Sequence, residues 1–388
     1  MAKFRILSLD GGGSWALIQV MALIDMYGGS VTGHEVLQDF DLAAGNSGGS
    51  IVLGGLVENM TLSDLLGFFM SEQRRKSVFV EKLLHLPNMA KYETDEKLKG
   101  LLAALPQRGG WFLPQATSGI LSNSTGQPIH LLIIGFDYDR NRSRFFRSAA
   151  ASGAAWGGGD ASQVRLAEAI HASTNAPVMF FDKPADFPSE PGRRYWDGAI
   201  TGCNNPVLAA VTEAIVLGQS PDSIAALSIG TGTVYRPQAP AGAAPSILFA
   251  PVESPGVLHD LEKLASAIVD DPPDVASFMA HVLTGGSRGL PSPGDSRVVR
   301  MSPMVAPARN ANGNWSLPEN LDEHAFNNLA NLAMDAVVQD QVLAIQNLAS
   351  LWLQDKMPNQ PIRMDGSLNC ELGQEQYSKA KTAWLAVK

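Results

Sequence analysis

The residues from Gly45 to Gly49 read Gly-Asn-Ser-Gly-Gly and match the spacing of a nucleophile elbow around Ser47. In an elbow the serine occupies a strained turn between a strand and a helix, and glycines two positions away on either side avoid collisions with both elements. The hydroxyl then projects at the helix N-terminus, where partial positive charge favours a developing oxyanion. Ser47 is therefore a candidate nucleophile, and a plain glycine turn is the alternative.

A second glycine cluster, Asp-Gly-Gly-Gly-Ser at 10–14, precedes the elbow. Three consecutive glycines expose backbone N–H groups with no side chain in the way, as an anion or oxyanion site requires. A phosphate loop is disfavoured because the Gly-x-x-x-x-Gly-Lys-[Ser/Thr] pattern is absent. Ala16 also stands where a dinucleotide-binding loop that starts at Gly11 would place its last glycine. The cluster is a candidate oxyanion hole, with a tight turn as the alternative.

A nucleophilic serine needs a base. The Ser, acid, His order of an α/β-hydrolase would leave His259, His281 or His324 as the base, but no convincing strand precedes any of them. The other candidate is Asp197, which follows an aromatic pair and precedes a glycine, as in a loop at a strand end. A lone Asp-Gly is usually only a turn, so the two possibilities stay open on the residues alone.

The elements that position these residues follow from the hydrophobic pattern. A strand, a glycine turn and a helix occur in succession twice within the first sixty residues, which predicts an α/β domain with a largely parallel sheet. The predicted strands are 4–9, 40–44, 128–138, 143–148, 225–231 and 296–303. The predicted helices are 15–27, 48–59, 163–173, 205–218 and 322–354.

The stretch 236–256 is rich in proline and alanine and interrupts this pattern. Because a further strand is predicted after it, we expect a single domain over 1–355 with an insertion around 236–290. Residues 356–388 are then a C-terminal extension.

Composition narrows the classes of function. The chain has 388 residues, of which 45% are hydrophobic and 17% charged, enough for a large core. With 38 acidic and 29 basic residues, a net charge of -9 and no long basic block, nucleic acid is not an expected partner. The two cysteines, Cys203 and Cys370, have no metal-ligand spacing, and no metal or other cofactor is expected; one bridge between them stays open.

The sequence shows no signal peptide and no run of about 18 apolar residues, so a soluble, cytoplasmic protein is expected. The apolar stretches 65–70 and 109–114 could touch a membrane surface or an acyl chain. The alternative is a core helix for the first stretch and a packed loop for the second.

Taken together and in order, these motifs resemble the patatin-like phospholipase family. The resemblance covers about residues 4–354 and is carried by segments that are each loose but jointly specific. They are Leu-Ser-Leu-Asp-Gly-Gly-Gly-Ser (7–14), Gly-Asn-Ser-Gly-Gly (45–49), 136–148, His-Ala-Ser-Thr-Asn-Ala-Pro-Val-Met-Phe (171–180), Trp-Asp-Gly-Ala-Ile-Thr-Gly-Cys-Asn-Asn-Pro (196–206), Leu-Ser-Ile-Gly-Thr-Gly (227–232), Arg-Val-Val-Arg-Met-Ser-Pro-Met-Val (297–305) and Leu-Asp (321–322).

The resemblance implies a three-layer α/β/α sandwich with a helical C-terminal region. It also implies hydrolysis of lipid acyl esters by a Ser-Asp dyad without histidine, in which Ser47 is the nucleophile and Asp197 the base. The reaction would pass through an acyl-enzyme, with a lipid or ester as substrate. The implied oxyanion hole comprises Gly11, Gly12, Gly13 and Ser14, and the candidate substrate contacts are Trp15 and Gly48.

One position departs from the family pattern. Members usually carry Asp-Gly-Gly-Gly-x-[Arg/Lys]-Gly, whereas here Trp15 stands at the basic position and Ala16 follows it. Since Trp15 offers an apolar face in place of a cation, neutral lipids, lysolipids or small esters are favoured over phospholipids. The same departure motivates a rival interpretation, in which the fold binds a lipid or signalling molecule without turnover.

Overall fold

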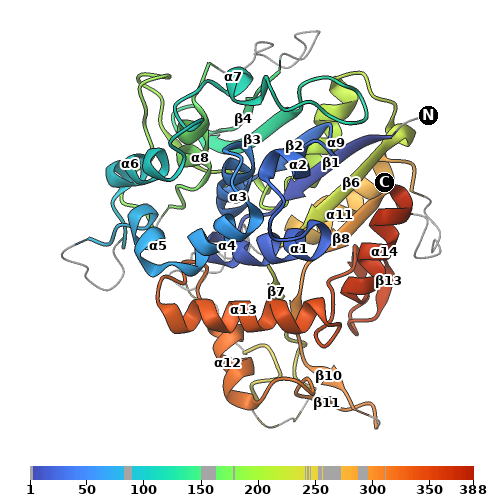
Figure 1. Ribbon diagram of the computed structural model, residues 1–388. Coiled ribbons are helices and arrows are strands. Elements are labelled where there is room, and N and C mark those ends of the chain that lie inside the picture. The colour runs from blue at the N-terminus through green and yellow to red at the C-terminus, as the bar shows by residue number, and fades with distance from the viewer. Residues whose placement is uncertain are drawn as a thin grey trace.

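The computed structural model describes residues 3–82, 90–149, 163–177, 180–240, 242, 244, 246–251, 256, 272–286, 296–310 and 312–388. At its centre lies a seven-stranded sheet in the order β4-β3-β2-β1-β6-β8, with β5 also paired to β3 (Figure 1). Strands β1, β2, β3, β6 and β8 run parallel, and β4 and β5 pair antiparallel with β3. The strands are β1 (Phe4–Leu9), β2 (Leu42–Gly45), β3 (His130–Asp137), β4 (Arg142–Arg147), β5 (Tyr195–Asp197), β6 (Ile224–Ile229) and β8 (Val298–Met301).

The register of the parallel strands brings the two glycine segments together. Leu9, the last residue of β1, pairs with Gly45, the last residue of β2, and on the other side with Ile229 of β6. Because parallel strands end at the same edge of a sheet, the loop after β1 and the elbow after β2 leave the sheet side by side.

Both faces of the sheet are covered, which makes the architecture a three-layer α/β/α sandwich. In β1, Leu7 and Leu9 belong to one apolar core, while Phe4 and Ile6 belong to the other, as the alternation of a strand requires. The larger core includes side chains of α1 (Leu17–Tyr27), α3 (Ser47–Val57), α8 (Leu166–Ser173), α13 (Gln339–Leu353) and α14 (Tyr377–Val387). The smaller core includes side chains of α9 (Val207–Val216) and α11 (Pro272–Leu283).

Shorter elements surround this sandwich (Figure 1). Among the described residues, the remaining helices are α2 (Gly33–Leu37), α4 (Leu62–Met70), α5 (Glu72–Val78), α6 (Thr94–Ala104), α7 (Leu113–Thr117), α12 (Glu323–Asn331) and the 3-10 turns η1 (Gly13–Ala16), η2 (Gly198–Thr201) and η3 (Pro221–Ser223). Two-stranded ribbons pair β7 (Thr233–Val234) with β9 (Met304–Val305), β10 (Ala308–Arg309) with β11 (Trp315–Ser316), and β12 (Arg363–Met364) with β13 (Cys370–Leu372).

The predicted long helix at 322–354 is wrong, because two helices occupy this stretch. Helix α12 ends at Asn331, and α13 begins at Gln339. The segment 332–338 between them has no glycine or proline to break a helix, and its backbone carbonyls accept hydrogen bonds from distant parts of the chain instead. The other predicted strands and helices are present, with ends shifted by a few residues.

Two further segments bear on the sequence-based expectations. The apolar stretch 65–70 lies in α4, and Leu65, Phe68 and Phe69 are buried in the larger core, as a core helix requires.

Much of 236–290, the expected insertion, lies outside the described residues; the part that is described contains α11. Within the described ranges, no helix is both long enough and apolar enough to cross a bilayer.

The C-terminal extension packs on the body of the sandwich. The Trp384 ring stacks on Phe40 with 5.8 Å between ring centroids, and Tyr377 meets Trp352 edge to face at 4.6 Å. Both Trp384 and Tyr377 are part of the larger core.

Candidate active site

Ser47 lies at the first position of α3, directly after β2, and is partly exposed. Its φ of +47° is in the left-handed region, which a residue with a Cβ adopts only under strain. The Ser47 N–H donates to Oγ of Ser173 at 3.0 Å, so the turn is held from α8 as well as from its own helix. This is the strand–turn–helix geometry that the elbow motif predicts.

The glycine loop lies directly against this turn. A methyl group placed on Gly11 would come within 3.0 Å of the Ser47 Cβ, and one placed on Gly48 would come within 2.5 Å of the Gly13 carbonyl oxygen. Only glycine therefore lets the loop after β1 and the start of α3 approach this closely. The structure brings the two glycine motifs together, and Gly48 is a contact between them.

Asp197 ends β5 and is only 3% exposed. Its Oδ1 accepts hydrogen bonds from the Ala199 N–H at 2.9 Å and from Asn46 Nδ2 at 3.1 Å. The Ser47 side chain is among the groups that lower the pKa of this carboxyl, so it lies close enough to influence it. Because Asn46 adjoins Ser47 in the chain, its hydrogen bond to Asp197 places the candidate base beside the candidate nucleophile, although 150 residues separate the two in the sequence.

The environment of Asp197 favours its neutral form more than water does. Burial is the largest influence and raises the pKa of this carboxyl above its ordinary value. The hydrogen bonds from Ala199 and Asn46 act in the opposite direction, as do the nearby Ser47 side chain and the positive charge of Lys97. A base with a raised pKa is better matched to proton transfer near neutral pH than an ordinary aspartate.

The backbone donors of the glycine loop fall into two groups. The Gly11 N–H donates to the carbonyl of Asn204 at 2.9 Å. Among the described residues, the N–H groups of Gly12 and Gly13 have no hydrogen-bond acceptor. These two groups, next to Ser47, are the free donors that the loop offers.

The segment between α12 and α13 covers the end of the loop. The Ser14 N–H donates to the carbonyl of Met334 at 3.0 Å, and the Trp15 Nε1 donates to the carbonyl of Ala333 at 3.3 Å. Trp15 is 6% exposed, and its ring also lies against Gly232. Little of the Trp15 surface is therefore open to a substrate in this conformation.

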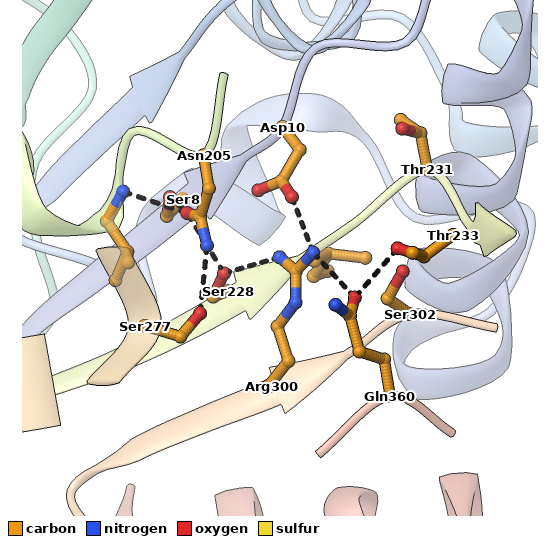
Figure 2. A network of polar contacts seen from close by, with 12 residues as sticks. Ser8, Asp10, Asn205, Ser228, Thr231, Thr233, Ser277, Arg300, Ser302 and Gln360 are labelled. Carbon is orange, nitrogen blue, oxygen red and sulfur yellow. Dashed lines mark hydrogen bonds and ion pairs between the residues drawn. The ribbon is translucent and has the colours of Figure 1, made fainter. Parts of the chain in front are cut away.

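A buried ion pair fixes Asp10, the residue that starts the loop. Figure 2 shows Arg300 of β8 reaching Asp10, with 2.6 Å between Nη2 and Oδ2 and both side chains 2% exposed. The Arg300 guanidinium also donates to Ser228 Oγ at 2.9 Å and to Gln360 Oε1 at 3.2 Å. Burial raises the pKa of Asp10 to about 6, although Arg300 opposes this shift.

The histidines considered as alternative bases lie elsewhere. His324 is exposed on α12, and His281 of α11 is hydrogen-bonded through Nδ1 to Ser296 Oγ at 2.9 Å. His259 lies outside the described residues. The described parts of the chain also contain no group of three His, Cys, Asp or Glu side chains that could hold a metal ion.

Sequence reasoning missed four residues of this site. Asn46 was inside the elbow motif, and Ser173 and Asn175 were inside the His-Ala-Ser-Thr-Asn motif at 171–175, but nothing in the motifs indicated what they would bind. Asn175 accepts the Asp197 N–H at 3.0 Å through its backbone carbonyl. The fourth residue, Lys97 of α6, belongs to no motif.

A parallel α/β/α sandwich with a strained serine turn, a glycine loop and a buried aspartate defines a class of nucleophile-elbow folds. The family model described as patatin-like phospholipase matches residues 7–211, more than half of the 388 residues. The chain therefore belongs to the patatin-like phospholipase family. The matched region contains both Ser47 and Asp197.

Two relatives add detail. Over 213 residues, or 55% of this chain, the sequence is 26% identical to a Caenorhabditis elegans protein described as intracellular phospholipase A2. That match covers 17% of the relative, so this chain spans a small part of its length. The crystal structure of VipD from Legionella pneumophila aligns with 90% of this chain and 67% of its own at 10% identity and a TM-score of 0.33.

Proposed function

We propose that this protein is a lipid acyl hydrolase that cleaves carboxylic esters, with Ser47 as the nucleophile and Asp197 as the general base. Family membership supports the reaction class. The observation that carries the proposal is a serine held at a φ of +47° whose neighbour Asn46 donates to a 3% exposed aspartate, beside a loop with free N–H donors among the described residues.

In the acylation step Asp197 accepts the Ser47 Oγ proton while Oγ bonds to the ester carbonyl carbon. The resulting oxyanion accepts hydrogen bonds from the N–H groups of Gly12 and Gly13, which have no other acceptor among the described residues. The tetrahedral intermediate then collapses, the ester C–O bond breaks, and Asp197 returns its proton to the leaving alcohol.

Deacylation repeats the sequence with water. Asp197 takes a proton from the water as its oxygen attacks the acyl carbon. The bond to Ser47 Oγ then breaks, the proton returns to the serine, and a carboxylic acid leaves. No histidine is needed, because the same carboxylate serves as base and acid in both halves.

The substrate we propose is a lipid ester. The relative described as intracellular phospholipase A2 makes phospholipids one class to test. The lack of a cation at position 15, where the family usually has one, favours neutral lipids, lysolipids or small esters instead. Hydrolysis of phosphatidylcholine, a lysophospholipid and a monoacylglycerol, compared side by side, distinguishes these classes.

The deciding measurement is hydrolysis of a medium-chain p-nitrophenyl ester. We expect Ser47→Ala and Asp197→Asn each to lower kcat by roughly a thousandfold or more. Matched controls are Ser118→Ala and Asp95→Asn, two exposed residues whose substitution should leave the rate unchanged. Equal rates in the wild type and the two site variants would refute the proposal.

Covalent labelling gives an independent test. A fluorophosphonate should modify Ser47, and mass spectrometry of the digested protein locates the adduct. An adduct on a different serine would show that the elbow has been assigned to the wrong residue.

One observation favours a second function: the backbone carbonyl of Met334 occupies the Ser14 N–H at the end of the glycine loop. Because the Ser14 N–H already has a protein acceptor and Trp15 is buried, the fold could bind a lipid without turning it over. Tight binding of a fatty acid or lysolipid, with no hydrolysis and no fluorophosphonate adduct, would support this binding function.

A further inference from the structure

Lys97 is a fully buried lysine next to the site. It lies on α6 and has 0% of its surface exposed. Its Nζ donates to the backbone carbonyl of His171 at 3.0 Å and to Oδ1 of Asn175 at 2.7 Å. The same Nζ lies 4.0 Å from the centroid of the Phe181 ring, a distance typical of a cation–π contact. A buried lysine is costly, so contacts of this kind are needed to hold it.

These contacts lead from Lys97 to the base. The Asn175 side chain is held from both ends, because its Oδ1 accepts from Lys97 and its Nδ2 donates to the Lys183 carbonyl at 2.8 Å. The Asn175 backbone carbonyl in turn accepts the Asp197 N–H at 3.0 Å. Lys97 therefore holds the Asn175 side chain, and the Asn175 carbonyl holds the backbone of Asp197.

We propose that Lys97 is a positioning residue for the Ser47–Asp197 pair: its Nζ anchors Asn175, whose backbone carbonyl holds the Asp197 N–H, and it brings a cationic group into the buried site. This inference rests on the proposed function, since it concerns the base of that reaction. The matched family region and the motifs do not assign a role to Lys97.

The charges around the two groups are consistent with this role. Burial lowers the pKa of Lys97 well below its ordinary value, and the charge of Asp197 opposes that shift. The charge of Lys97 in turn opposes the effect of burial on the pKa of Asp197. Each charged form thus supports the other.

The other titratable groups near Lys97 and Asp197 are either neutral or paired with other residues. Burial lowers the pKa of the His171 ring well below its ordinary value, with Lys97 and Lys183 acting in the same direction, so the ring is neutral near pH 7. The Lys183 ammonium pairs with the exposed Asp95 at 2.7 Å. Asp182, on the segment that follows Phe181, pairs with Lys82 at 3.0 Å.

The test is the pH dependence of fluorophosphonate labelling at Ser47, which reports on the dyad without substrate binding or product release. Lys97→Met removes the charge and the donor at similar length, whereas Lys97→Gln removes the charge but keeps a donor for Asn175. Lys99→Met is the matched control, because Lys99 lies on the same helix with its side chain 73% exposed.

We expect both Lys97 variants to shift the acid midpoint of labelling to higher pH, so that labelling on the acid limb falls by on the order of tenfold. Labelling at alkaline pH should stay near the wild-type rate in Lys97→Gln, and Lys99→Met should match the wild type throughout. Circular dichroism checks that each variant is folded. If Lys97→Met does not fold, the comparison of Lys97→Gln with the wild type is sufficient for the test.

Two results would overturn the inference in distinguishable ways. An unchanged midpoint in a folded variant, with or without a uniform loss of rate, would reduce Lys97 to a structural residue and leave the proposed function intact. A wild-type protein that is not labelled at Ser47 at any pH would refute the proposed function, and this inference with it.

Discussion

The backbone carbonyl oxygen of Met334 lies 3.0 Å from the backbone nitrogen of Ser14 and closes one end of the glycine loop. The same segment is fastened on its other side, since the Asp335 carboxylate accepts hydrogen bonds from Tyr92 OH at 2.8 Å and Lys91 Nζ at 2.9 Å. The loop beside the nucleophile is therefore shaped by a stretch of chain near the C-terminal end.

Gly13→Ala tests how tightly this segment and the loop are packed. Gly13 has a φ of +54°, and an added methyl group would collide with the Met334 carbonyl oxygen. We expect the free energy of unfolding to fall by about 1–3 kcal/mol, measured by urea denaturation. Gly67→Ala in α4, where nothing lies within 4 Å, should instead be neutral or stabilising. Equal effects of the two substitutions would contradict the packing.

Ser173→Ala tests the support of the elbow. The substitution leaves the Ser47 N–H without the acceptor that it has at 3.0 Å. We expect the free energy of unfolding to fall by about 1–3 kcal/mol. Ester hydrolysis should fall by on the order of tenfold, because the nucleophile is less well oriented. Denaturation and kinetics on the same preparation check both effects, and a fully active variant would show that α3 alone orients Ser47.

The Asp10–Arg300 pair predicts a pH dependence of stability. The pKa of Asp10 is about 6 in the folded protein and 3.8 as the ordinary value, so the folded state holds the proton more tightly. Stability from this group is therefore lost as pH rises from about 4 to about 6. Asp10→Asn removes this titration but also leaves the buried Arg300 guanidinium without its counter-ion. Whatever the loss of the pair costs, the stability of the variant relative to the wild type should rise by up to about 3 kcal/mol between pH 4 and pH 7.

Urea denaturation of the wild type and Asp10→Asn at several pH values between 4 and 8 measures this difference. The difference should change between about pH 4 and pH 7 and level off at higher pH, where Asp10 is ionised. Asp95→Asn, at an exposed position, serves as the control and should show no comparable trend. A stability difference that stays constant across this range would show that the pKa of Asp10 does not change on folding.

Trp384→Ala tests whether the C-terminal extension is part of the folding unit. Trp384 is 1% exposed and stacks on Phe40, so its loss should cost about 3–5 kcal/mol. The neighbouring Leu385 is 62% exposed, and Leu385→Ala should change stability by less than about 0.5 kcal/mol. Thermal or urea unfolding compares the two variants. A similar small effect in both would mean that residues 356–388 fold as an independent appendage.

The local pattern of the sequence predicts the elements that carry Ser47 and the glycine loop. At Ser47 the pattern works because a strand, a turn and a helix are short-range features, and glycine is required wherever two backbones touch. The same reasoning places Asp197 near a strand end, where the structure has the three-residue strand β5.

Long-range contacts account for what the sequence does not predict. Residues 332–338 look helical by composition, but the carbonyl of Val337 accepts from Arg75 at 2.8 Å, and that of Met334 accepts from Ser14. Carbonyls used in this way leave the helical path, and tertiary contacts override local preference. The role of Lys97 could not be predicted for the same reason, because Lys97 comes close to Asn175 only through the packing of α6 in the folded protein.

The ion pair between Asp10 and Arg300 also has a consequence for biosynthesis. A chain synthesised from its N-terminus contains Ser47, Asp197 and the whole family match before the strand that carries Arg300 has been made, and Met334 follows later still. Until then Asp10 has no counter-ion and Ser14 no acceptor, so the glycine loop cannot take its final shape. Such contacts between distant parts of a chain form late and slowly. The nascent protein therefore carries its nucleophile for much of translation in an unfinished site.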